Sequence, residues 1–565
     1  MLFSIIIWFL LCIFLYLTGV TILKLLGAEY LKRIGDRFII SVWLGIIIYS
    51  NLFLALSIFL PLSPIIGAVA IILSAFSTLW KPVRLEIISL YQTLSKRKAL
   101  SISVLAIFLS SIMTQEITWI DTGLYHFGSI RWLSEYGAVP GVALIHERLG
   151  FTSSWFALAA PLNFDFFDGS RTGSLLNGFI YFIFIIHFST SIYYVAYGKT
   201  RQSDYFIIAL SVVTIPLFLF TSMFKLMSEM LVSTSPDIPI IFLVMVVGWS
   251  ILNIEDDQDR GVNFKNGIAD SEADIIALIL STGAVSIKIT ALPLMFVAYL
   301  FYVFNKGFKP RRAMTGIGII CLILTPLFIF GIVTSGCPLY PQRFMCLDLP
   351  WSITHPGQVL GWSSNSNSNA ISTLWIWIKE SGKNQIMLLL NVYTIGASLL
   401  LFKILDIKKS NNQMWLLLIG ILGLTFLMIK GPSLRFGFGF GTLAPCLLAA
   451  KFLQERVDKI RQSKFLSTFY ISSRRNIRFA STLLISMVIL NSLIGGVTDS
   501  KIFLPPKLST PQVVMRQVND VTYFLPVNHS ALCWDAELPC TFKTDLDVRL
   551  RDPSRGIKAG FIYNE

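Results

Sequence analysis

The chain has few charged residues for its length. Of its 565 residues, 14% are charged, whereas 54% are hydrophobic and 13% are aromatic. Soluble chains average about 25% charged residues, so this deficit excludes an ordinary soluble enzyme. Apolar runs of about 20 residues indicate helices in lipid, and because the runs are continuous rather than alternating they exclude a membrane β-barrel. We therefore predict an all-α polytopic membrane protein.

Several motifs are missing from the sequence as well. It has no Walker loop, no dinucleotide-binding fingerprint, no metalloprotease motif and no G-x-S-x-G elbow. A soluble basic domain is also missing, so the net charge of +14 indicates topology-setting residues beside membrane helices. Membrane lipid is thus an expected partner, and nucleic acid is not.

The apolar runs divide the chain into a transmembrane domain, 1–497, and a C-terminal tail or small subdomain, 498–565. About fourteen helices are expected in the first part. Their predicted ranges are 3–23, 38–60, 65–80, 101–115, 174–197, 205–222, 237–253, 274–287, 290–304, 313–333, 385–402, 413–430, 436–450 and 479–497.

The positive charges predict how these helices are oriented. Alternate connections hold 28 Lys and Arg residues, from Lys24 to Arg478, whereas the opposite connections hold 10 when the long tail is left out. Positive residues accumulate in cytoplasmic loops, so the first set is expected to be cytoplasmic. The large loops and the tail are then expected to face outwards, as in a multi-pass protein of a cell membrane.

The cysteines agree with this orientation. Cys12, Cys321 and Cys446 fall within apolar helices, whereas the other four form two close pairs. These pairs, Cys337 with Cys346 and Cys533 with Cys540, both fall on the side assigned as external. Disulfides persist outside the cytoplasm, so two local disulfides are favoured over four free thiols or a metal site built from both pairs.

The connection at about 116–173 carries the densest polar chemistry. Apolar and aromatic residues recur at helical spacing between Trp119 and Tyr136, which predicts a short interfacial helix ended by Pro140 and Gly141. Asp121, Tyr125 and His126 stand at its start, and Glu116 is nearby. Asp121 fits two roles equally well: a general base flanked by aromatics, or an N-cap of the helix.

Single charges stand in the other external connections. Asp237 follows Ser-Pro at the mouth of a helix, and Lys288 interrupts an apolar stretch. Arg343 lies in SGCPLYPQRFMC, and Arg435 lies in GPSLRFGFGFG. Two carboxylates and three cations on one side of the membrane are the pattern expected for an anionic, lipid-linked substrate.

These features together resemble the GT-C superfamily, membrane glycosyltransferases that use polyprenyl-phosphate-linked sugars. The resemblance rests on an acidic residue in an early external loop, the later Ser235-Pro236-Asp237 and a Lys in a short turn. The stretches DTGLYHFGSIRWLSEYGAVPGVALIHERLGFTSSWF, SGCPLYP and CWDAELPC are more similar to an uncharacterised family of bacterial membrane proteins with GT-C-like architecture.

The resemblance implies a GT-C-like core at about 101–450 and an inverting sugar transfer in which Asp121 is the base. Asp237 would be the second acidic position, and Lys288, Arg343 and Arg435 would hold the donor phosphate. Glu116, Tyr125 and His126 would be further residues that bind the donor phosphate or the substrate. The resemblance also implies a bacterial inner membrane with the active face external. The chain departs from typical members in two ways. Three helices precede the loop-bearing pair where typical members have one, and the usual adjacent acidic pair is not evident around Asp121, since Glu116 lies five residues away.

Two other functions remain open from the sequence: a transporter or flippase for lipid-linked oligosaccharide, and an oligosaccharide polymerase. Transporters usually show repeated halves and ionisable residues at mid-membrane, and neither is evident. The acceptor is a glycan, a lipid or a protein. A divalent cation is compatible with the loop carboxylates but is not required by the sequence, so the metal stays unknown.

Overall fold

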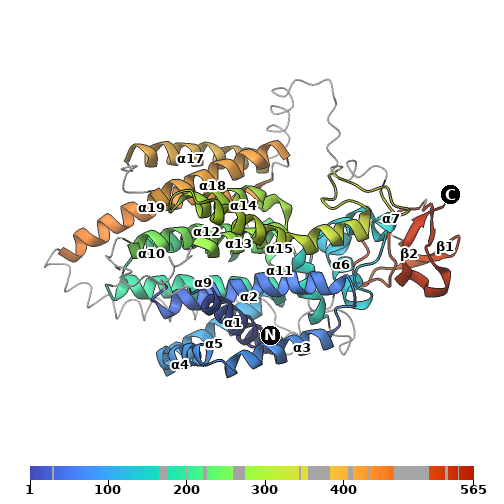
Figure 1. The fold of residues 1–565 in the computed structure, drawn as a ribbon, viewed down its shortest axis with the longest axis horizontal. Coiled ribbons are helices and arrows are strands. Elements are labelled where there is room, and N and C mark those ends of the chain that lie inside the picture. Colours follow the sequence, from blue (N-terminus) through green and yellow to red (C-terminus); the bar gives the residue numbers. More distant parts are fainter. Residues whose placement is uncertain are drawn as a thin grey trace, which may run out of the picture.

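The computed structural model describes residues 1–27, 31–163, 175–198, 200–219, 225–258, 274–342, 345–353, 382–404, 411–430, 433–462, 508–527, 532–544 and 546–564. Long helices lie side by side through most of these residues, and short helices and strands gather at one end (Figure 1). We call this end, which carries α6 (Phe127–Glu135) and the four strands, the strand end. The opposite end, where α2 (Ile34–Ser57) begins, is the far end.

Among the described residues, eight helices are long and apolar enough to cross a membrane. They are α1 (Leu2–Leu25), α2, α9 (Leu175–Ala196), α10 (Gln202–Leu219), α12 (Asp237–Gln258), α15 (Pro310–Ser335), α18 (Asn411–Lys430) and α19 (Leu434–Gln462). Shorter helices complete the bundle: α5 (Lys96–Ile112), α11 (Lys225–Val232), α13 (Asp274–Ile287), η5 (Ile289–Ala291), α14 (Leu292–Phe304) and α17 (Gly382–Ile404).

The bend after α3 (Pro64–Phe76) differs from the sequence prediction. A single helix was expected at 65–80, followed by a loop, but after η1 (Ser77–Leu79) the chain turns by 94° into α4 (Lys81–Thr93). Pro82 stands in the first turn of α4, where a proline is tolerated because its missing N–H is not needed. If this bent pair is one span, the number of candidate spans is nine.

Every predicted helix from 3–23 to 436–450 coincides with a helix of the structure, and 479–497 lies outside the described residues. The long apolar helices support a membrane protein. Helix pairs pack closely where side chains are small: at Gly45, a Cβ atom would lie 2.0 Å from the carbonyl oxygen of Leu15 on α1.

Buried ion pairs join the helices at the far end. Arg201 contacts Asp36 at 3.4 Å and Asn253 at 2.6 Å, which ties the start of α10 to α2 and α12. Arg312 of α15 bonds Asp274 of α13 at 2.9 Å. Each charge has an opposite charge beside it, so these pairs can be held away from water.

The segment between α5 and α9 forms short helices at the strand end. These are η2 (Thr122–His126), α6, α7 (Val142–Ile145), η3 (Glu147–Gly150), α8 (Ser154–Ala159) and η4 (Ala160–Leu162). The predicted helix after Trp119 is therefore present, but its predicted interfacial position is wrong. Phe127 and Trp132 are buried within the protein, and the Trp132 ring lies 6.2 Å from that of Phe561 in the C-terminal tail.

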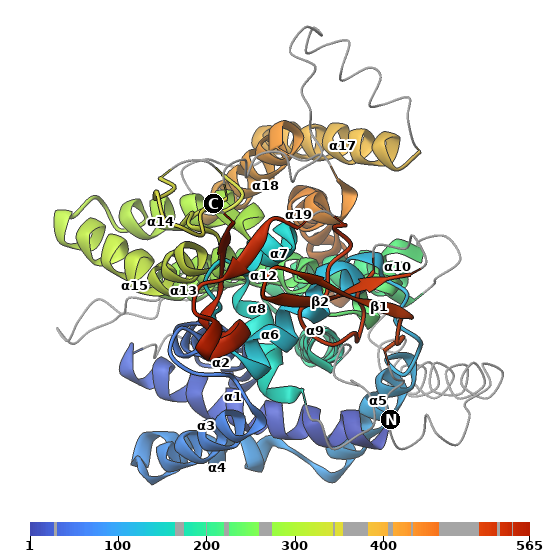
Figure 2. The same cartoon turned by 90° about the vertical axis from the view of Figure 1, so that its right-hand side faces the viewer.

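The tail forms a small unit, called here the C-terminal unit (508–527, 532–544 and 546–564). Strands β1 (Val513–Val518) and β2 (Val521–Pro526) are antiparallel, as are β3 (Val548–Leu550) and β4 (Phe561–Tyr563), with η7 (Pro553–Ala559) between the last two. The strands lie across α6, α7 and α8 (Figure 2). Because Val521, Val548 and Phe561 share an apolar cluster with Trp132, the unit is packed onto the helices.

Both predicted disulfides are confirmed. Cys337 is bonded to Cys346 after α15, and Cys533 is bonded to Cys540 in the C-terminal unit. The other cysteines are free and lie in α1, α15 and α19, as the sequence predicted.

Candidate functional site

Asp121 lies directly before η2, and its carboxylate faces two arginines. Arg435 donates to it at 2.7 Å, and Arg148 lies 3.7 Å from its other oxygen. The side chain makes no capping hydrogen bond to the helix that follows. Of the two roles left open by the sequence, the N-cap is therefore excluded, and the carboxylate is turned towards the cations.

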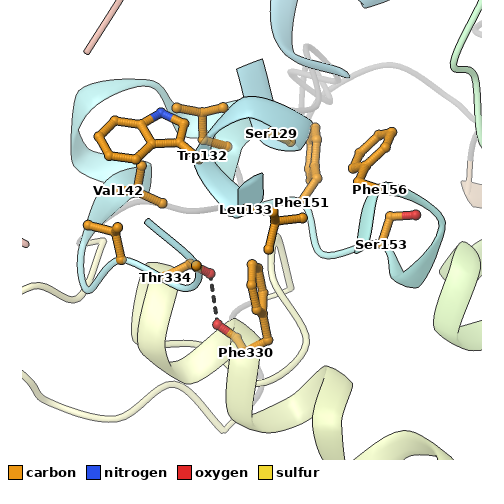
Figure 3. A pocket seen from close by; sticks show the side chains of 12 residues that line it. Ser129, Trp132, Leu133, Val142, Phe151, Ser153, Phe156, Phe330 and Thr334 are labelled. Carbon is orange, nitrogen blue, oxygen red and sulfur yellow. Dashed lines mark hydrogen bonds between the residues drawn. The ribbon is translucent and has the colours of Figure 1, made fainter. Parts of the chain in front are cut away.

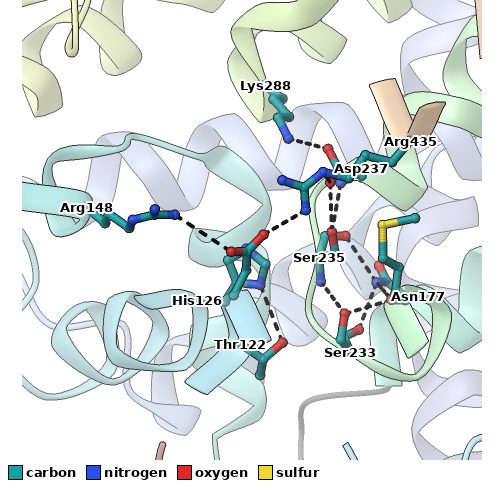
Figure 4. A network of polar contacts seen from close by, with 11 residues as sticks. Thr122, His126, Arg148, Asn177, Ser233, Ser235, Asp237, Lys288 and Arg435 are labelled. Atoms are coloured by element: carbon teal, nitrogen blue, oxygen red, sulfur yellow. Dashed lines mark hydrogen bonds and ion pairs between the residues drawn. The ribbon is translucent and has the colours of Figure 1, made fainter. Parts of the chain in front are cut away.

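Asp237 begins α12 and is held by the turn that precedes it. The Ser235 hydroxyl donates to the carboxylate at 3.3 Å and accepts from the Asp237 backbone N–H at 3.3 Å. Asn177 on α9 donates to the carbonyl oxygens of Met230, Ser233 and Ser235, at 3.2, 2.8 and 3.1 Å (Figure 4). The turn is thus fixed from a neighbouring helix, and the Asp237 carboxylate has a set direction.

Lys288 reaches Asp237 from the break between α13 and η5. Its backbone is extended at this point, and its ammonium donates a hydrogen bond to Asp237 Oδ1. The ammonium also lies 4.1 Å above the centre of the Phe436 ring. Burial lowers the pKa of Lys288 below its usual value, and the carboxylate of Asp237 acts in the opposite direction.

Arg435 joins the two carboxylates. It stands in the first turn of α19, with one nitrogen 2.7 Å from Asp121 and another 3.7 Å from Asp237. Its guanidinium lies 5.2 Å from the Trp119 ring and 4.8 Å from the Phe436 ring. A planar guanidinium can contact two anions and aromatic faces at once, which a lysine at this position could not do.

An aromatic wall lies behind Asp121. The rings of Tyr125 and His126 are 4.4 Å apart, and each packs against Phe156. Burial lowers the pKa of His126 to about 3, so the imidazole is neutral at physiological pH. Burial also raises the pKa of Tyr125, and the negative charges of Asp121 and Asp237 raise it further. Neither side chain adds a charge to the cluster.

A small apolar pocket borders Phe156 of this wall (Figure 3). Phe151 and Phe156 line it together with Trp132 of α6 and Phe330 of α15. The Ser129 hydroxyl, which also lines it, is buried without a hydrogen-bond partner in the described part of the chain. None of the charged residues described above borders the pocket.

Most of the predicted site residues meet in one cluster. Asp121, Asp237, Lys288 and Arg435 are linked by ion pairs although up to 314 residues separate them, and Tyr125 and His126 form the adjoining wall. Glu116 is exposed, and among the described residues nothing links it to the cluster. Arg343 lies outside the described residues.

Other residues of the cluster received no role from the sequence. Arg148 is one of several charged residues in the same loop, and the sequence does not single it out. Its contact with Asp121 in the structure does. Asn177 is a polar residue within an apolar helix, which is a usable signal because such residues need partners in a membrane. Ser235 belongs to a Ser-Pro-Asp turn, and nothing else in the sequence indicates that its hydroxyl contacts Asp237.

The charges of the cluster do not cancel. Arg148, Lys288 and Arg435 are three cations, and Asp121 and Asp237 are two carboxylates. One positive charge is in excess, so the cluster is suited to a partner with negative charge. No group of three or more His, Cys, Asp or Glu that could hold a metal gathers in the described parts of the chain.

The comparisons with known proteins give a family without a named activity. A search of the curated proteins found no match, and a search of the solved structures found none either. Residues 1–442 match the family described as a domain of unknown function, DUF8201, and this range includes all five charged residues of the cluster. The chain therefore belongs to the DUF8201 family.

Proposed function

We propose that the protein is a membrane glycosyltransferase that uses a polyprenyl-phosphate-linked sugar, with Asp121 as the general base. The observation that carries this proposal is the meeting of Asp121 and Asp237 at Arg435, with Lys288 and Arg148 beside them. This cluster lies where apolar helices end, so a lipid-linked anion can enter it with its chain still in the membrane.

The two carboxylates differ in exposure, which suggests different roles. The Asp121 side chain is 17% exposed, whereas that of Asp237 is 4% exposed. An acceptor hydroxyl can therefore reach Asp121 but not Asp237. A general base must come within hydrogen-bond reach of the proton that it takes, so Asp121 fits that role, and Asp237 holds Lys288 and Arg435 in place.

The cations are accessible enough to bind phosphate. The side chains of Arg148, Arg435 and Lys288 are 38%, 24% and 20% exposed. Phosphate oxygens accept charge-assisted hydrogen bonds from guanidinium and ammonium groups, and such bonds strengthen as the leaving phosphate gains charge. In this proposal the three cations bind the donor phosphate.

The reaction proceeds in one displacement. The acceptor oxygen forms a bond to the anomeric carbon of the sugar while the bond from that carbon to the phosphate oxygen breaks. The hydroxyl proton moves to Asp121, and the bonding electrons leave with the polyprenyl phosphate. Attack from the side opposite the phosphate inverts the anomeric centre. The acceptor is a glycan, a lipid or a protein.

The proposal includes a GT-C-like architecture, fourteen spans and a strand end that faces away from the cytoplasm of a bacterial inner membrane. Two observations support the orientation. Both disulfides lie at the strand end, and disulfides form outside the cytoplasm. The connections with the excess of Lys and Arg include those that precede α2 and α15, at the far end.

The test expresses the Asp121→Asn variant in a strain from which the gene for this protein has been deleted. Mass spectrometry then compares the cell-surface glycans of this strain with those of the wild type. We expect Asp121→Asn to lower transfer at least about 100-fold, because the amide cannot accept the proton, while the protein still inserts in the membrane. Glu116→Gln is the matched control: it neutralises an exposed carboxylate of the same loop and should leave the glycans unchanged.

Two outcomes would overturn the proposal. Normal glycans in the Asp121→Asn strain would remove Asp121 as the base. If deletion of the gene also removed whole glycans, then transport of a lipid-linked oligosaccharide, rather than sugar transfer, would account for the phenotype.

A further inference from the structure

The C-terminal unit touches two segments that follow Asp121 in the chain. Its loop 533–540, closed by the Cys533–Cys540 disulfide, lies against η2 and α6. Its segment 541–543 lies along residues 145–147, next to Arg148. The carboxylate of Asp121 and its partner Arg148 are therefore both carried by chain that the C-terminal unit supports.

Trp534 makes the contact with η2. Its backbone N–H donates to the carbonyl oxygen of Gly123 at 2.9 Å, and its indole covers the Cα atom of that glycine. A Cβ atom on Gly123 would lie 2.4 Å from the indole, so only glycine fits beneath the ring. Trp534 has a φ of 39°, a conformation that few non-glycine residues adopt, so other contacts must hold this loop.

Those contacts are present on both sides of the loop. Arg131 of α6 donates to the carbonyl oxygens of Asp535 and Ala536, at 3.2 and 2.7 Å. On the opposite side the loop is bonded to β2, where Phe524 donates to the carbonyl of Pro539 at 2.9 Å. The loop is thus held between α6 and the β1–β2 hairpin.

The second contact holds the segment before Arg148. The Thr541 hydroxyl donates to the carbonyl of Ile145 at 2.8 Å, the Phe542 ring packs on the ring of His146, and Lys543 pairs with Glu147 at 2.9 Å. His146 in turn accepts a hydrogen bond from the backbone N–H of Arg148 at 3.1 Å. The position of Arg148 therefore depends on the C-terminal unit through His146.

The segment that carries Asp121 is irregular. η2 is a π-helical turn of five residues that runs directly into α6, and such turns are rare distortions of a helix, so contacts from outside the helix can determine its position. The family match ends at residue 442, so the cluster lies within it and the C-terminal unit lies beyond it. Residues beyond the matched range therefore contact the segments that carry Asp121 and Arg148.

We propose that the C-terminal unit positions the catalytic segment, with Trp534 on Gly123 as the positioning contact and the Cys533–Cys540 disulfide holding Trp534 in place. The effect on catalysis rests on the proposed role of Asp121 as the base, whereas the effect on the structure of η2 does not. Trp534 is a positioning residue: it acts on Asp121 through η2.

The test combines hydrogen exchange with glycan analysis, using the full-length protein. We expect Trp534→Ala to raise amide exchange in residues 119–135 at least about tenfold, whereas Trp534→Phe, which keeps a ring over Gly123, restores protection. Trp351→Ala is the matched control: Trp351 also contacts the C-terminal unit, through Arg551, but not η2, so it should leave exchange in 119–135 unchanged.

A second pair of variants tests the contact itself. Gly123→Ala forces the indole away and should also raise exchange in 119–135. The double variant Gly123→Ala with Trp534→Ala should be no worse than Trp534→Ala alone, because the added methyl then meets no ring. Replacing Cys533 and Cys540 together with serine should reproduce the effect of Trp534→Ala.

The outcomes separate this proposal from the proposed function. Unchanged exchange in Trp534→Ala, or additive effects in the double variant, would overturn the positioning contact even if Asp121→Asn abolished transfer. Raised exchange with normal glycans in Trp534→Ala would overturn its link to catalysis. Raised exchange with a loss of glycan that Trp534→Phe restores supports the proposal.

Discussion

Two groups of charges at opposite ends of the helix bundle are held in different ways. At the far end, the side chains of Arg201 and Asp36 are 4% and 5% exposed, and those of Arg312 and Asp274 are 9% and 0% exposed. At the strand end, Asp121 and its partners Arg148 and Arg435 keep between 17% and 38% exposure, and the cations outnumber the carboxylates. These two far-end pairs are covered and matched in charge, so they hold helices together. The strand-end charges are held in position but remain accessible, as a site for an anionic substrate requires.

The largest effect is expected from breaking a far-end pair. Asp274→Ala leaves the guanidinium of Arg312 buried without its carboxylate, which should lower the free energy of unfolding by about 3–5 kcal/mol. Thermal unfolding of the purified protein in detergent measures this loss. The double variant Asp274→Ala with Arg312→Met should regain most of the stability, and a double variant as unstable as the single one would show that the charge is not the cause.

At the strand end, Lys288→Ala should weaken phosphate binding, while Arg435 remains beside the buried carboxylate of Asp237. Lys288 is partly exposed beside Asp237, so its loss should reduce affinity for polyprenyl monophosphate by about tenfold, the equivalent of about 1.4 kcal/mol. Ligand-induced thermal stabilisation of the purified protein is the measurement, with a polyprenol that lacks phosphate as the control ligand. Equal affinity of the variant and the wild type for the monophosphate would exclude this contact.

The smallest effect at neutral pH is expected for the buried histidines, which change how stability depends on pH. The pKa of His126 is lowered from 6.5 to about 3, so between these values the unfolded chain binds a proton at this residue that the folded protein does not. Stability therefore falls as the pH falls through this window, and it is regained above pH 6.5. His126→Gln removes this contribution, so the free energy of unfolding of the variant should fall less steeply below pH 6.5 than that of the wild type. His146→Gln should act in the same way, since burial and the nearby Arg148 lower the pKa of His146 to about 3. If the stability of both variants falls below pH 6.5 as steeply as that of the wild type, the two imidazoles are not buried in their neutral form.

The sequence predicted the helices better than the site. Apolar runs determine helices in lipid directly, and the paired cysteines indicated both disulfides because their spacing allows a local bond. The contact between Asp121 and Arg435 could not be derived, because no periodicity relates residues that are 314 positions apart. Only their common side of the membrane was predicted.

Two predictions were wrong, each for its own reason. The apolar stripe that includes Phe127 and Trp132 has the spacing of an interfacial helix, but the C-terminal unit covers it, and periodicity cannot distinguish lipid from protein as the apolar partner. The charged segment 81–98 was predicted as a loop, but a new helix begins there after the bend at Leu79. Pro82 in the first turn of that helix favours the new start.

The difference between the two ends can be tested most directly by comparing Asp121→Asn with Asp274→Ala in one assay. Both remove a carboxylate that is paired with arginine. The measured quantity is the amount of transferred sugar per molecule of folded, membrane-inserted protein. Mass spectrometry of the glycans gives the amount of product, and the fraction of protein that stays folded in detergent gives the amount of folded protein. We expect Asp121→Asn to give normal amounts of folded protein without product, and Asp274→Ala to give little folded protein with normal product per molecule. Normal product per molecule from Asp121→Asn, or its loss from folded Asp274→Ala, would contradict the assignment of chemistry to the strand end.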